Sequence, residues 1–243
     1  MNFPRKTVER VREEGGRSLP LRIALLVPAY NAVGTIAGVI RDALRFMRRE
    51  DIIVIDDGSR DGTGAAARAL GVTVLFHKTN RGKGAALRTG FQRIISGDYD
   101  GAVLMDADGQ HEARFLPELL ARASAGREGI IVGTRMDRVG QMPWIRQLTN
   151  RLTSAVVSAL AGLRIPDSQS GYRFIHSDVL RRLRLTTSRY ETESEMLIQA
   201  GRMGYCIGAL PISSIYGEER SAIRPGRDTV RFIRLVLRTV ILS

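Results

Sequence analysis

The stretch "VLMDADGQH", from Val103 to His111, begins as a buried strand and ends in two carboxylates, Asp106 and Asp108. On an extended chain, residues i and i+2 point to the same face, so these two like charges lie side by side. Such charges repel each other, and a nearby cation is the usual reason for the arrangement to persist. With Gln110 the stretch offers hard oxygen ligands at alternate positions, as Mg²⁺ and Mn²⁺ prefer. The three residues therefore predict a divalent metal site, although acids before a glycine also commonly start a turn and cap a helix.

Outward from this stretch, short apolar runs alternate with segments of helical spacing. The predicted strands are the runs 22–27, 51–56, 72–77, 101–106 and 129–134, and the predicted helices between them include 32–48, 62–70 and 84–95. Strands and helices that alternate at roughly 25-residue intervals indicate an α/β fold with a mainly parallel sheet covered by helices. The polar turns then lie at the carboxyl ends of strands, where open α/β sheets bind their ligands.

Three of these strand ends carry unusual chemistry and are expected to converge on one edge of the sheet. They are "PAYN" (28–31), "DDGSRDGT" (56–63) and "DADGQH" (106–111). Asp57 is a candidate to accept hydrogen bonds from a nucleobase or sugar, whereas Asp61 is suited to cap the next helix. Lys83 begins a helix after a glycine-rich loop and either reaches a phosphate or is simply solvated.

The composition fits one packed domain with an anionic partner. The chain has 243 residues and a net charge of +12, which phosphates, nucleic acid or anionic lipid would match, as would a solvated arginine-rich surface. The single cysteine, Cys206, excludes an intrachain disulfide and a cysteine-rich zinc site, and we expect it to be a small buried hydrophobe. We find no secretory signal and no convincing transmembrane helix, so we expect a cytoplasmic protein that lies on a membrane if it meets one.

Three regions follow from the pattern: an N-terminal arm (1–20), one domain (21–225) and a C-terminal amphipathic helix (226–243). Beyond residue 141 apolar residues keep helical spacing, at Ile145, Leu148, Leu152, Val156, Leu160 and Leu163. In the last segment Arg227, Arg231, Arg234 and Arg238 follow one side of a helix that is otherwise rich in Val, Phe, Ile and Leu. This pattern suits a membrane surface, and packing against the domain or a partner protein fits it equally well.

Seven segments in order resemble the family 2 glycosyltransferases with the GT-A fold, especially the dolichyl-phosphate mannose synthases and polyprenyl-phosphate hexose synthases. They are "VPAYNAVGTI", "VIDDGSRDGT", "NRGKGAALRTG", "MDADGQH", "GTR", "DSQSGYRF" and "YETESEMLIQA", and they span about residues 22 to 225. Each is moderately specific, but all seven in order are hard to obtain by chance.

The resemblance implies a role for each matching position. For the nucleotide sugar these are Pro28, Tyr30, Asn31, Asp57, Lys83, Asp106 and Ala107, and for the metal, Mg²⁺ or Mn²⁺, they are Asp106, Asp108 and Gln110. Asp108, Arg135 and Asp167 correspond to catalytic positions, with Arg135 resembling an arginine that contacts phosphate. The acceptor side is implied to include Arg146, Arg151, Ser170, Gly171 and Arg220.

Two departures from the family pattern affect the substrates more than the fold. Many members have a glutamate after "P-x-Y-N", where this chain has Ala32, so one polar contact to the nucleotide is absent. Many also have Ser-Lys-Ile near the end, where Ala222 replaces the basic residue and Arg220 or Arg224 would substitute for it.

The resemblance implies a metal-dependent inverting glycosyltransferase that moves a hexose from a nucleoside diphosphate sugar (GDP- or UDP-hexose) to a polyprenyl phosphate. An alternative is a soluble sugar hydroxyl as acceptor, which needs a base such as Asp167, Glu191, Glu193 or Glu195. A second alternative, a basic nucleic-acid-binding domain, explains the charge but gives the acidic motifs no role, so no nucleic acid is expected. The three histidines, His77, His111 and His176, are expected to be structural or peripheral.

Overall fold

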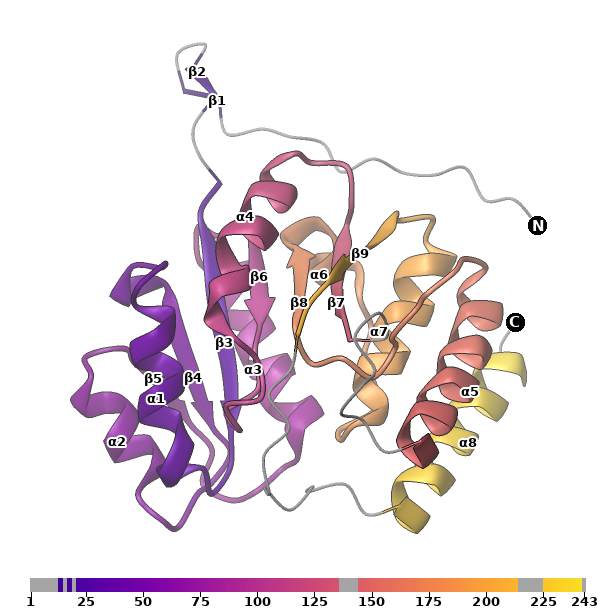
Figure 1. Cartoon of the computed structure of the whole chain (residues 1–243), viewed down its shortest axis with the longest axis horizontal. Helices are drawn as coiled ribbons and strands as arrows, with labels where there is room; N and C mark the ends of the chain where they lie inside the picture. Colours follow the sequence, from indigo (N-terminus) through magenta and orange to yellow (C-terminus); the bar gives the residue numbers. More distant parts are fainter. Residues whose placement is uncertain (1–12, 15–16, 19–20, 136–143, 214–224, 242–243) are drawn as a thin grey trace.

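The apolar runs of the sequence form the strands of one central sheet (Figure 1). The computed structural model describes residues 13–14, 17–18, 21–135, 144–213 and 225–241. The strands of the sheet are β3 (Ile23–Ala29), β4 (Ile52–Asp56), β5 (Thr73–Phe76), β6 (Gly101–Leu104), β7 (Ile130–Thr134), β8 (Arg173–His176) and β9 (Ile207–Pro211). A short separate pair, β1 (Glu13–Glu14) and β2 (Arg17–Ser18), precedes them in the N-terminal region.

Helices connect the strands and cover both faces of the sheet. They are α1 (Val33–Ala43), α2 (Thr63–Ala69), α3 (Lys83–Ser96), α4 (Leu116–Ser124), α5 (Trp144–Ala161), α6 (Ser177–Arg182), α7 (Glu191–Arg202) and α8 (Pro225–Ile241), with short 3₁₀ turns η1 (Arg49–Asp51) and η2 (Ala113–Phe115). No helix of the described ranges has the length and apolar character needed to cross a bilayer.

The strand order, β5-β4-β3-β6-β8-β7-β9, confirms a mainly parallel sheet. Strands β3 to β6 run parallel, and β8 runs antiparallel to both of its neighbours, β6 and β7. The chain proceeds from β3 outward to β5 and then returns to place β6 on the other side of β3. The three polar turns after β3, β4 and β6 therefore meet at one edge, where the direction of strand addition reverses and α/β sheets bind ligands.

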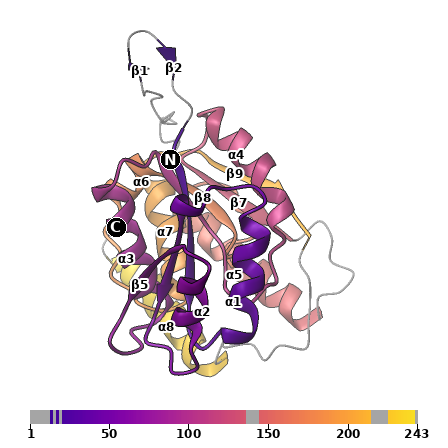
Figure 2. The same ribbon diagram turned by 90° about the vertical axis from the view of Figure 1, so that its left-hand side faces the viewer.

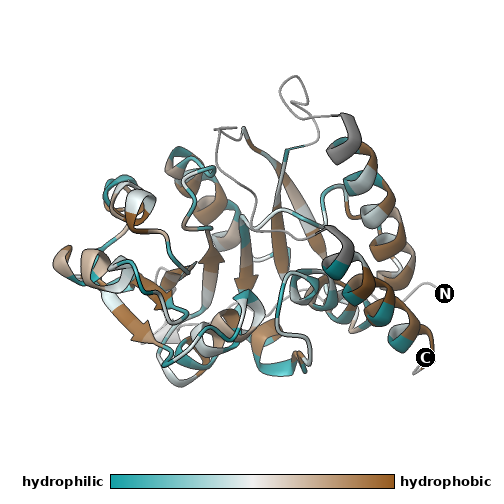
Figure 3. Cartoon of the chain, turned by 90° about the horizontal axis from the view of Figure 1, so that it is seen from below, coloured by the Kyte–Doolittle hydropathy of each residue, from teal (hydrophilic) through white to brown (hydrophobic). Residues whose placement is uncertain are grey.

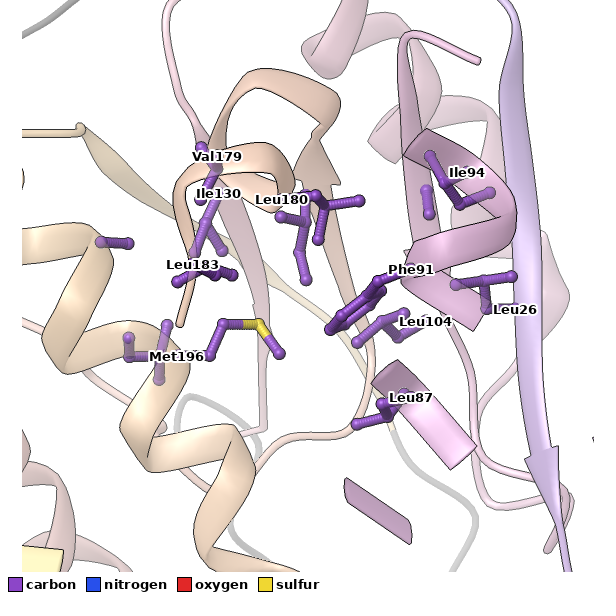
Figure 4. Close-up of a cluster of buried hydrophobic side chains, with 14 of the residues drawn as sticks. Leu26, Leu87, Phe91, Ile94, Leu104, Ile130, Val179, Leu180, Leu183 and Met196 are labelled. Carbon is purple, nitrogen blue, oxygen red and sulfur yellow. The ribbon is translucent and has the colours of Figure 1, made fainter. Parts of the chain in front are cut away.

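Strand β3 shows how the sequence fills both faces of the sheet. Ala24 and Leu26 belong to one buried cluster, whereas Leu25 and Val27 belong to the cluster on the opposite face, as the two-residue period of a strand requires. The first cluster lies under α3, α5, α6, α7 and α8, and Figure 4 shows Phe91 and Leu180 pointing into it. The second lies under α1, α2 and α4, and Figure 2 shows α1 and α3 on opposite sides of the sheet.

Two details differ from the sequence-based expectation. Helix α1 ends at Ala43 rather than at residue 48, where a turn and then η1 lead into β4. Cys206 is half-buried rather than buried.

Candidate active site

A cavity of about 350 Å³ opens at the carboxyl ends of β3, β4 and β5. Its lining includes Tyr30 after β3, Asp56 at the end of β4, and Phe76 and Lys78 at the end of β5. The rest of the lining comes from the turns after β4 and β5 and from the first residues of α2: Gly58, Ser59, Arg60, Gly62, Thr63, Gly64, Ala65, His77, Thr79 and Asn80. Aromatic rings, cations and backbone groups around such a hollow suit a nucleotide.

The turns after β3 and β4 are fastened to each other. Asn31 adopts a left-handed backbone (φ 49°), its amide donates to Ser59 Oγ at 2.9 Å, and its side-chain oxygen accepts from the Arg60 amide at 3.0 Å. Asp61 accepts from the amide of Val33 at 3.0 Å and from that of Thr63 at 3.0 Å, the first residues of α1 and α2. Asp61 thus accepts from the first amide of α2, as its predicted capping role requires, from one residue before the N-cap position at Gly62.

Asp57 has a structural role that its sequence position did not reveal. Its carboxylate is buried, and it accepts hydrogen bonds from the amides of Arg81 (2.9 Å) and Gly82 (2.7 Å) and contacts His77 Nδ1 at 2.6 Å. These contacts fix the loop that leads into α3. Its neighbour Asp56 lines the cavity and accepts from the Ser59 amide at 2.9 Å, whereas the nucleotide contact of Asp57 stays a prediction.

Lys83 joins two carboxylates from distant parts of the chain. Its Nζ lies 2.6 Å from Asp106 Oδ1 and 3.0 Å from Glu193 Oε1 of α7. Burial opposes the charge of Lys83, but the two carboxylates outweigh it and raise the pKa of Lys83. Burial likewise acts against the charge of Asp106, yet Lys83 and His111 hold the pKa of Asp106 well below its usual range. Both groups are therefore charged at neutral pH.

The loop that the sequence predicts to bind the acceptor packs directly against Asp106. A side-chain carbon added at Gly171 would overlap the Asp106 carboxylate, so only glycine permits the approach. Ser170, the preceding residue, is fully buried, and its carbonyl accepts from Arg173 Nε at 3.0 Å. The structure thus brings the predicted donor-side and acceptor-side motifs into contact.

Asp108 and Gln110 are half-buried beside Asp106 and remain accessible. The Gln110 amide donates to Asp108 Oδ1 at 3.0 Å, and within the described ranges the other oxygen of Asp108 has no protein partner. The Ala107 carbonyl accepts from Thr35 Oγ1 at 2.6 Å, which ties this loop to α1.

These residues fit a divalent ion that is also held by substrate. The described residues contain no group of three or more His, Cys, Asp or Glu side chains arranged to hold a metal by themselves. Mg²⁺ is commonly bound by one or two carboxylates together with substrate phosphates, and Asp108, Gln110 and Asp106 supply that kind of incomplete oxygen set.

Asp167 is fully buried and engaged on both oxygens. It pairs with Arg135, whose Nε lies 2.9 Å from Oδ2, and it accepts from Asn150 Nδ2 at 2.9 Å. Burial acts to raise the pKa of Asp167, but Arg135 and Asn150 outweigh burial and lower it. A carboxylate held in this way is a weak base, and its contacts position Arg135 and α5.

The other acids that the sequence offers as bases differ in their contacts. Glu195 accepts from the backbone amides and hydroxyls of both Thr186 and Thr187, and Glu193 faces Lys83. Glu191 Oε2 is buried and has no hydrogen-bond partner within the described ranges.

The other residues predicted to bind the acceptor, or to lie near the nucleotide, have fewer contacts in the described structure. Arg151 is exposed on α5, whereas the side chain of Arg146 and all of Arg220 fall outside the described residues. Pro28 lies within β3 opposite Ile55, just before Tyr30 at the cavity.

Several residues that organise the site were missed. Arg173 is completely buried and donates to the carbonyls of Ser168, Ser170 and Glu193, and a basic residue inside the apolar run "RFI" is the signal that could have found it. His111, expected to be structural or peripheral, places Nε2 3.7 Å from Asp106 Oδ2. Thr35 and Asn150 carry no sequence signal of their own, because their roles depend on long-range packing.

Comparison with known proteins agrees with this geometry. Residues 24–184 match the family described as Glycosyl transferase family 2. The chain is 32% identical over 218 residues to a UDP-N-acetylglucosamine–dolichyl-phosphate N-acetylglucosaminyltransferase of Methanococcus voltae, covering 81% of this chain and 86% of that protein. It is 31% identical over 212 residues to an undecaprenyl-phosphate mannosyltransferase of Micrococcus luteus, covering 82% of this chain and 85% of that protein.

Among solved structures the chain resembles glucosyl-3-phosphoglycerate synthase from Mycobacterium tuberculosis. The complex with Mn²⁺, UDP-glucose and phosphoglyceric acid gives a TM-score of 0.73 at 21% identity, over 90% of this chain and 79% of that chain. The complex with Mg²⁺ and UDP gives 0.74 at 22% identity, with the same coverage of both chains. This likeness confirms the GT-A fold.

Proposed function

The chain belongs to glycosyltransferase family 2 and is a glycosyltransferase with the GT-A fold, and we propose that it transfers a hexose from a nucleoside diphosphate sugar to a polyprenyl phosphate. The names of two relatives that are 32% and 31% identical to this chain support a lipid phosphate as acceptor. One is named as a dolichyl-phosphate enzyme and the other as an undecaprenyl-phosphate enzyme. The nucleotide is proposed to occupy the cavity beside Tyr30 and Asp56, with its diphosphate directed toward Asp108.

The proposal of a phosphate acceptor rests on one observation: most acids of the site already form ion pairs or hydrogen bonds within the protein. A sugar hydroxyl needs a base to remove its proton, whereas a phosphate is already ionised near neutral pH. Of the four acids offered as bases, Asp167, Glu193 and Glu195 are held by arginine, lysine or backbone partners. An acceptor that needs no base fits this site best.

In the proposed reaction an acceptor phosphate oxygen attacks the anomeric carbon opposite the leaving group. The new bond joins that oxygen to the carbon, and the bond between the carbon and the diphosphate breaks, with its electron pair leaving on the nucleoside diphosphate. Asp108, Gln110 and Asp106 would hold Mg²⁺ or Mn²⁺, which when bound neutralises charge on the diphosphate. Arg135, oriented by Asp167, is proposed to contact phosphate, and the Gly171 loop holds Asp106 in place.

A soluble hydroxyl acceptor remains the second candidate because one observation favours it. The buried oxygen of Glu191 has no hydrogen-bond partner in the described residues, and the neighbouring Glu193 reaches Lys83 at the site. The solved neighbour also carries phosphoglyceric acid, which is a soluble molecule. With the other three acids engaged, a hydroxyl acceptor depends on Glu191 as its base.

Nucleoside diphosphate release from a panel of GDP- and UDP-hexoses tests the proposal. We expect release to require both polyprenyl phosphate and Mg²⁺ or Mn²⁺. Asp108→Asn should lower the rate on the order of 100-fold. The substitution removes the negative charge of a proposed metal ligand, so the ion that stabilises the departing diphosphate binds more weakly. Asp42→Asn, an exposed acid on α1, is the matched control and should stay within about twofold of the unmodified chain. Rapid release that ignores the lipid phosphate would contradict the proposed acceptor.

A further inference from the structure

Helix α5 carries an apolar stripe on the outside of the molecule as well as apolar residues on its inward side. Leu148 and Leu152 are 51% and 61% exposed, and Val156 follows them on the same side one turn later. The inward side is mixed: Val157 and Ala161 join the core cluster, whereas Asn150 and Ser154 hydrogen-bond to Asp167 and Ser168. An ordinary surface helix carries polar residues on its outer side, so the exposed apolar stripe of α5 is suited to contact something apolar.

Helix α8 has two apolar faces, and the domain covers one of them. Leu235 and Phe232 pack into the core cluster beneath α7. Ile233 and Leu237 are 51% and 57% exposed, with Val240 exposed beside them. Figure 3 shows hydrophobic residues along the helix that ends at the C label. The exposed apolar residues of this helix therefore form a second stripe that nothing in the described residues covers.

The two helices run in the same direction beside α7 (Figure 1). Arg202, the last residue of α7, donates to the carbonyls of Leu160 in α5 (3.0 Å) and Thr239 in α8 (3.2 Å), so the carboxyl ends of all three helices meet. The opposite end of α7 begins at Glu191 and reaches Lys83 through Glu193. The amino-terminal ends of α5 and α8 therefore lie toward the active site.

Positive charge accompanies the exposed stripes. Helix α5 contains two arginines and no acid, and α8 contains four arginines and one acid, Asp228. Arg227 and Arg234 are exposed on α8, and neither has a carboxylate partner in the described part of the chain. Apolar residues flanked by arginines match the two layers of an anionic membrane surface, acyl chains and phosphate headgroups.

We propose that the exposed stripes of α5 and α8, here called the outer face, dock the protein on an anionic bilayer with the amino-terminal ends of both helices directed toward the active site. The outer face consists of Leu148, Leu152 and Val156 together with Ile233, Leu237 and Val240. The proposal deepens the proposed function, on which it rests, because docking in this orientation brings a lipid-linked phosphate to the edge of the sheet that carries Asp106. A second copy of the chain is a less suitable partner for the outer face. Each copy has a net charge of +12, so two copies repel each other, whereas an anionic bilayer attracts the chain.

Co-sedimentation of the full chain with vesicles tests the docking directly. The vesicles contain no polyprenyl phosphate, so binding of the proposed acceptor does not contribute. Equimolar phosphatidylcholine and phosphatidylglycerol is compared with phosphatidylcholine alone, each at low and high salt. Leu237→Glu should lower partitioning into the anionic vesicles by roughly tenfold or more, because it replaces a side chain that enters the acyl region with a charge. Ile95→Glu, which places the same charge on a 38% exposed apolar residue of α3, is the matched control and should bind nearly as the unmodified chain does.

The arginines are tested by the lipid comparison. Arg234→Gln should weaken binding to the anionic vesicles by about fivefold and leave the weak binding to phosphatidylcholine unchanged, since an arginine near such a surface contributes mainly through its charge. High salt should remove most of this difference. Equal sedimentation of Leu237→Glu and Ile95→Glu would overturn the proposal. So would a dimer in sedimentation velocity that Leu237→Glu disperses, because it would assign the outer face to a second copy.

Nucleoside diphosphate release with a short, water-soluble prenyl phosphate separates this proposal from the proposed function. Leu237→Glu should retain the rate of the unmodified chain with that acceptor and lose rate only when the acceptor is embedded in vesicles. Vesicle binding without any turnover on prenyl phosphates would contradict the proposed function and support the docking. Turnover on prenyl phosphates without vesicle binding would support the proposed function and contradict the docking.

Discussion

Lys83 joins Asp106, in the loop after β6, to Glu193 at the start of α7. Its ammonium lies within 3.0 Å of carboxylates from Asp106 and Glu193, and its side chain is 17% exposed. A charged group with two close, partly buried partners is costly to remove, because the partners then repel each other. The pair of ion contacts therefore holds the loop after β6, which belongs to the candidate active site, against the start of α7.

Lys83→Met should lower the free energy of unfolding by about 3 kcal/mol, since it leaves two facing carboxylates without their cation. Adding Glu193→Gln should restore part of that loss, because it removes one of the two like charges. Urea denaturation of both variants measures the effect, and Lys78→Met, at an exposed lysine, is the control that should change by less than about 0.5 kcal/mol. If Lys83→Met were as stable as the control, the ion contacts of Lys83 would not contribute to the free energy of unfolding.

Asp167 should contribute to stability at neutral pH and lose that contribution in acid. Burial acts to raise the pKa of Asp167, but Arg135 outweighs burial and lowers it below its ordinary value of 3.8. The unfolded chain therefore binds the proton first as the pH falls, so the contribution is complete well above pH 3.8 and declines below that value. Asp167→Asn should have a shallower loss of unfolding free energy across this acid range. An unchanged acid slope in urea titrations at several pH values would show that Arg135 and Asp167 are not coupled.

At the scale of elements, α3 and α7 approach each other closely at Gly84. A side-chain carbon at this position would overlap the Thr192 hydroxyl and the Ser188 backbone. Gly84→Ala should therefore destabilise the fold by about 2 kcal/mol, as overpacking does. Gly38→Ala in α1 is the matched control, because nothing lies within 4 Å of the added carbon. The control should gain up to about 1 kcal/mol from helix propensity, and thermal unfolding that ranks the two variants the other way would contradict the packing described.

The sequence predicted the first half of the elements well and the second half only in part. Strands such as β3 and β6 are short apolar runs that end in polar turns, which is a strong local signal. Strand β8 was not predicted, because its residues "RFIH" include a buried arginine whose partners are backbone carbonyls of a distant loop. The periodicity of α5 was recognised, but whether its stripe faces the core or the outside depends on packing that a helical period does not contain.

At the scale of the whole molecule, the predicted convergence of three strand ends was confirmed, because β4, β3 and β6 are neighbours in the sheet. The residues on those ends that we propose to bind the metal and the nucleotide could be selected from the sequence. The partners of Lys83 and Asp167 were not, since each pair joins positions that only the folded chain brings together. The net charge of +12 predicted an anionic partner, and the outer face of α5 and α8 is where we propose that a lipid surface meets it.

Transfer of labelled hexose into a lipid extract tests the central claim most directly. The full chain is incubated with a labelled nucleoside diphosphate hexose, Mg²⁺ or Mn²⁺, and polyprenyl phosphate, and the product is extracted into organic solvent and identified by mass spectrometry. The account predicts one hexose joined to the lipid phosphate, formed equally well by Glu191→Gln, because a phosphate acceptor needs no base. Label that stays in the aqueous phase on a sugar hydroxyl, and that disappears in Glu191→Gln, would contradict it.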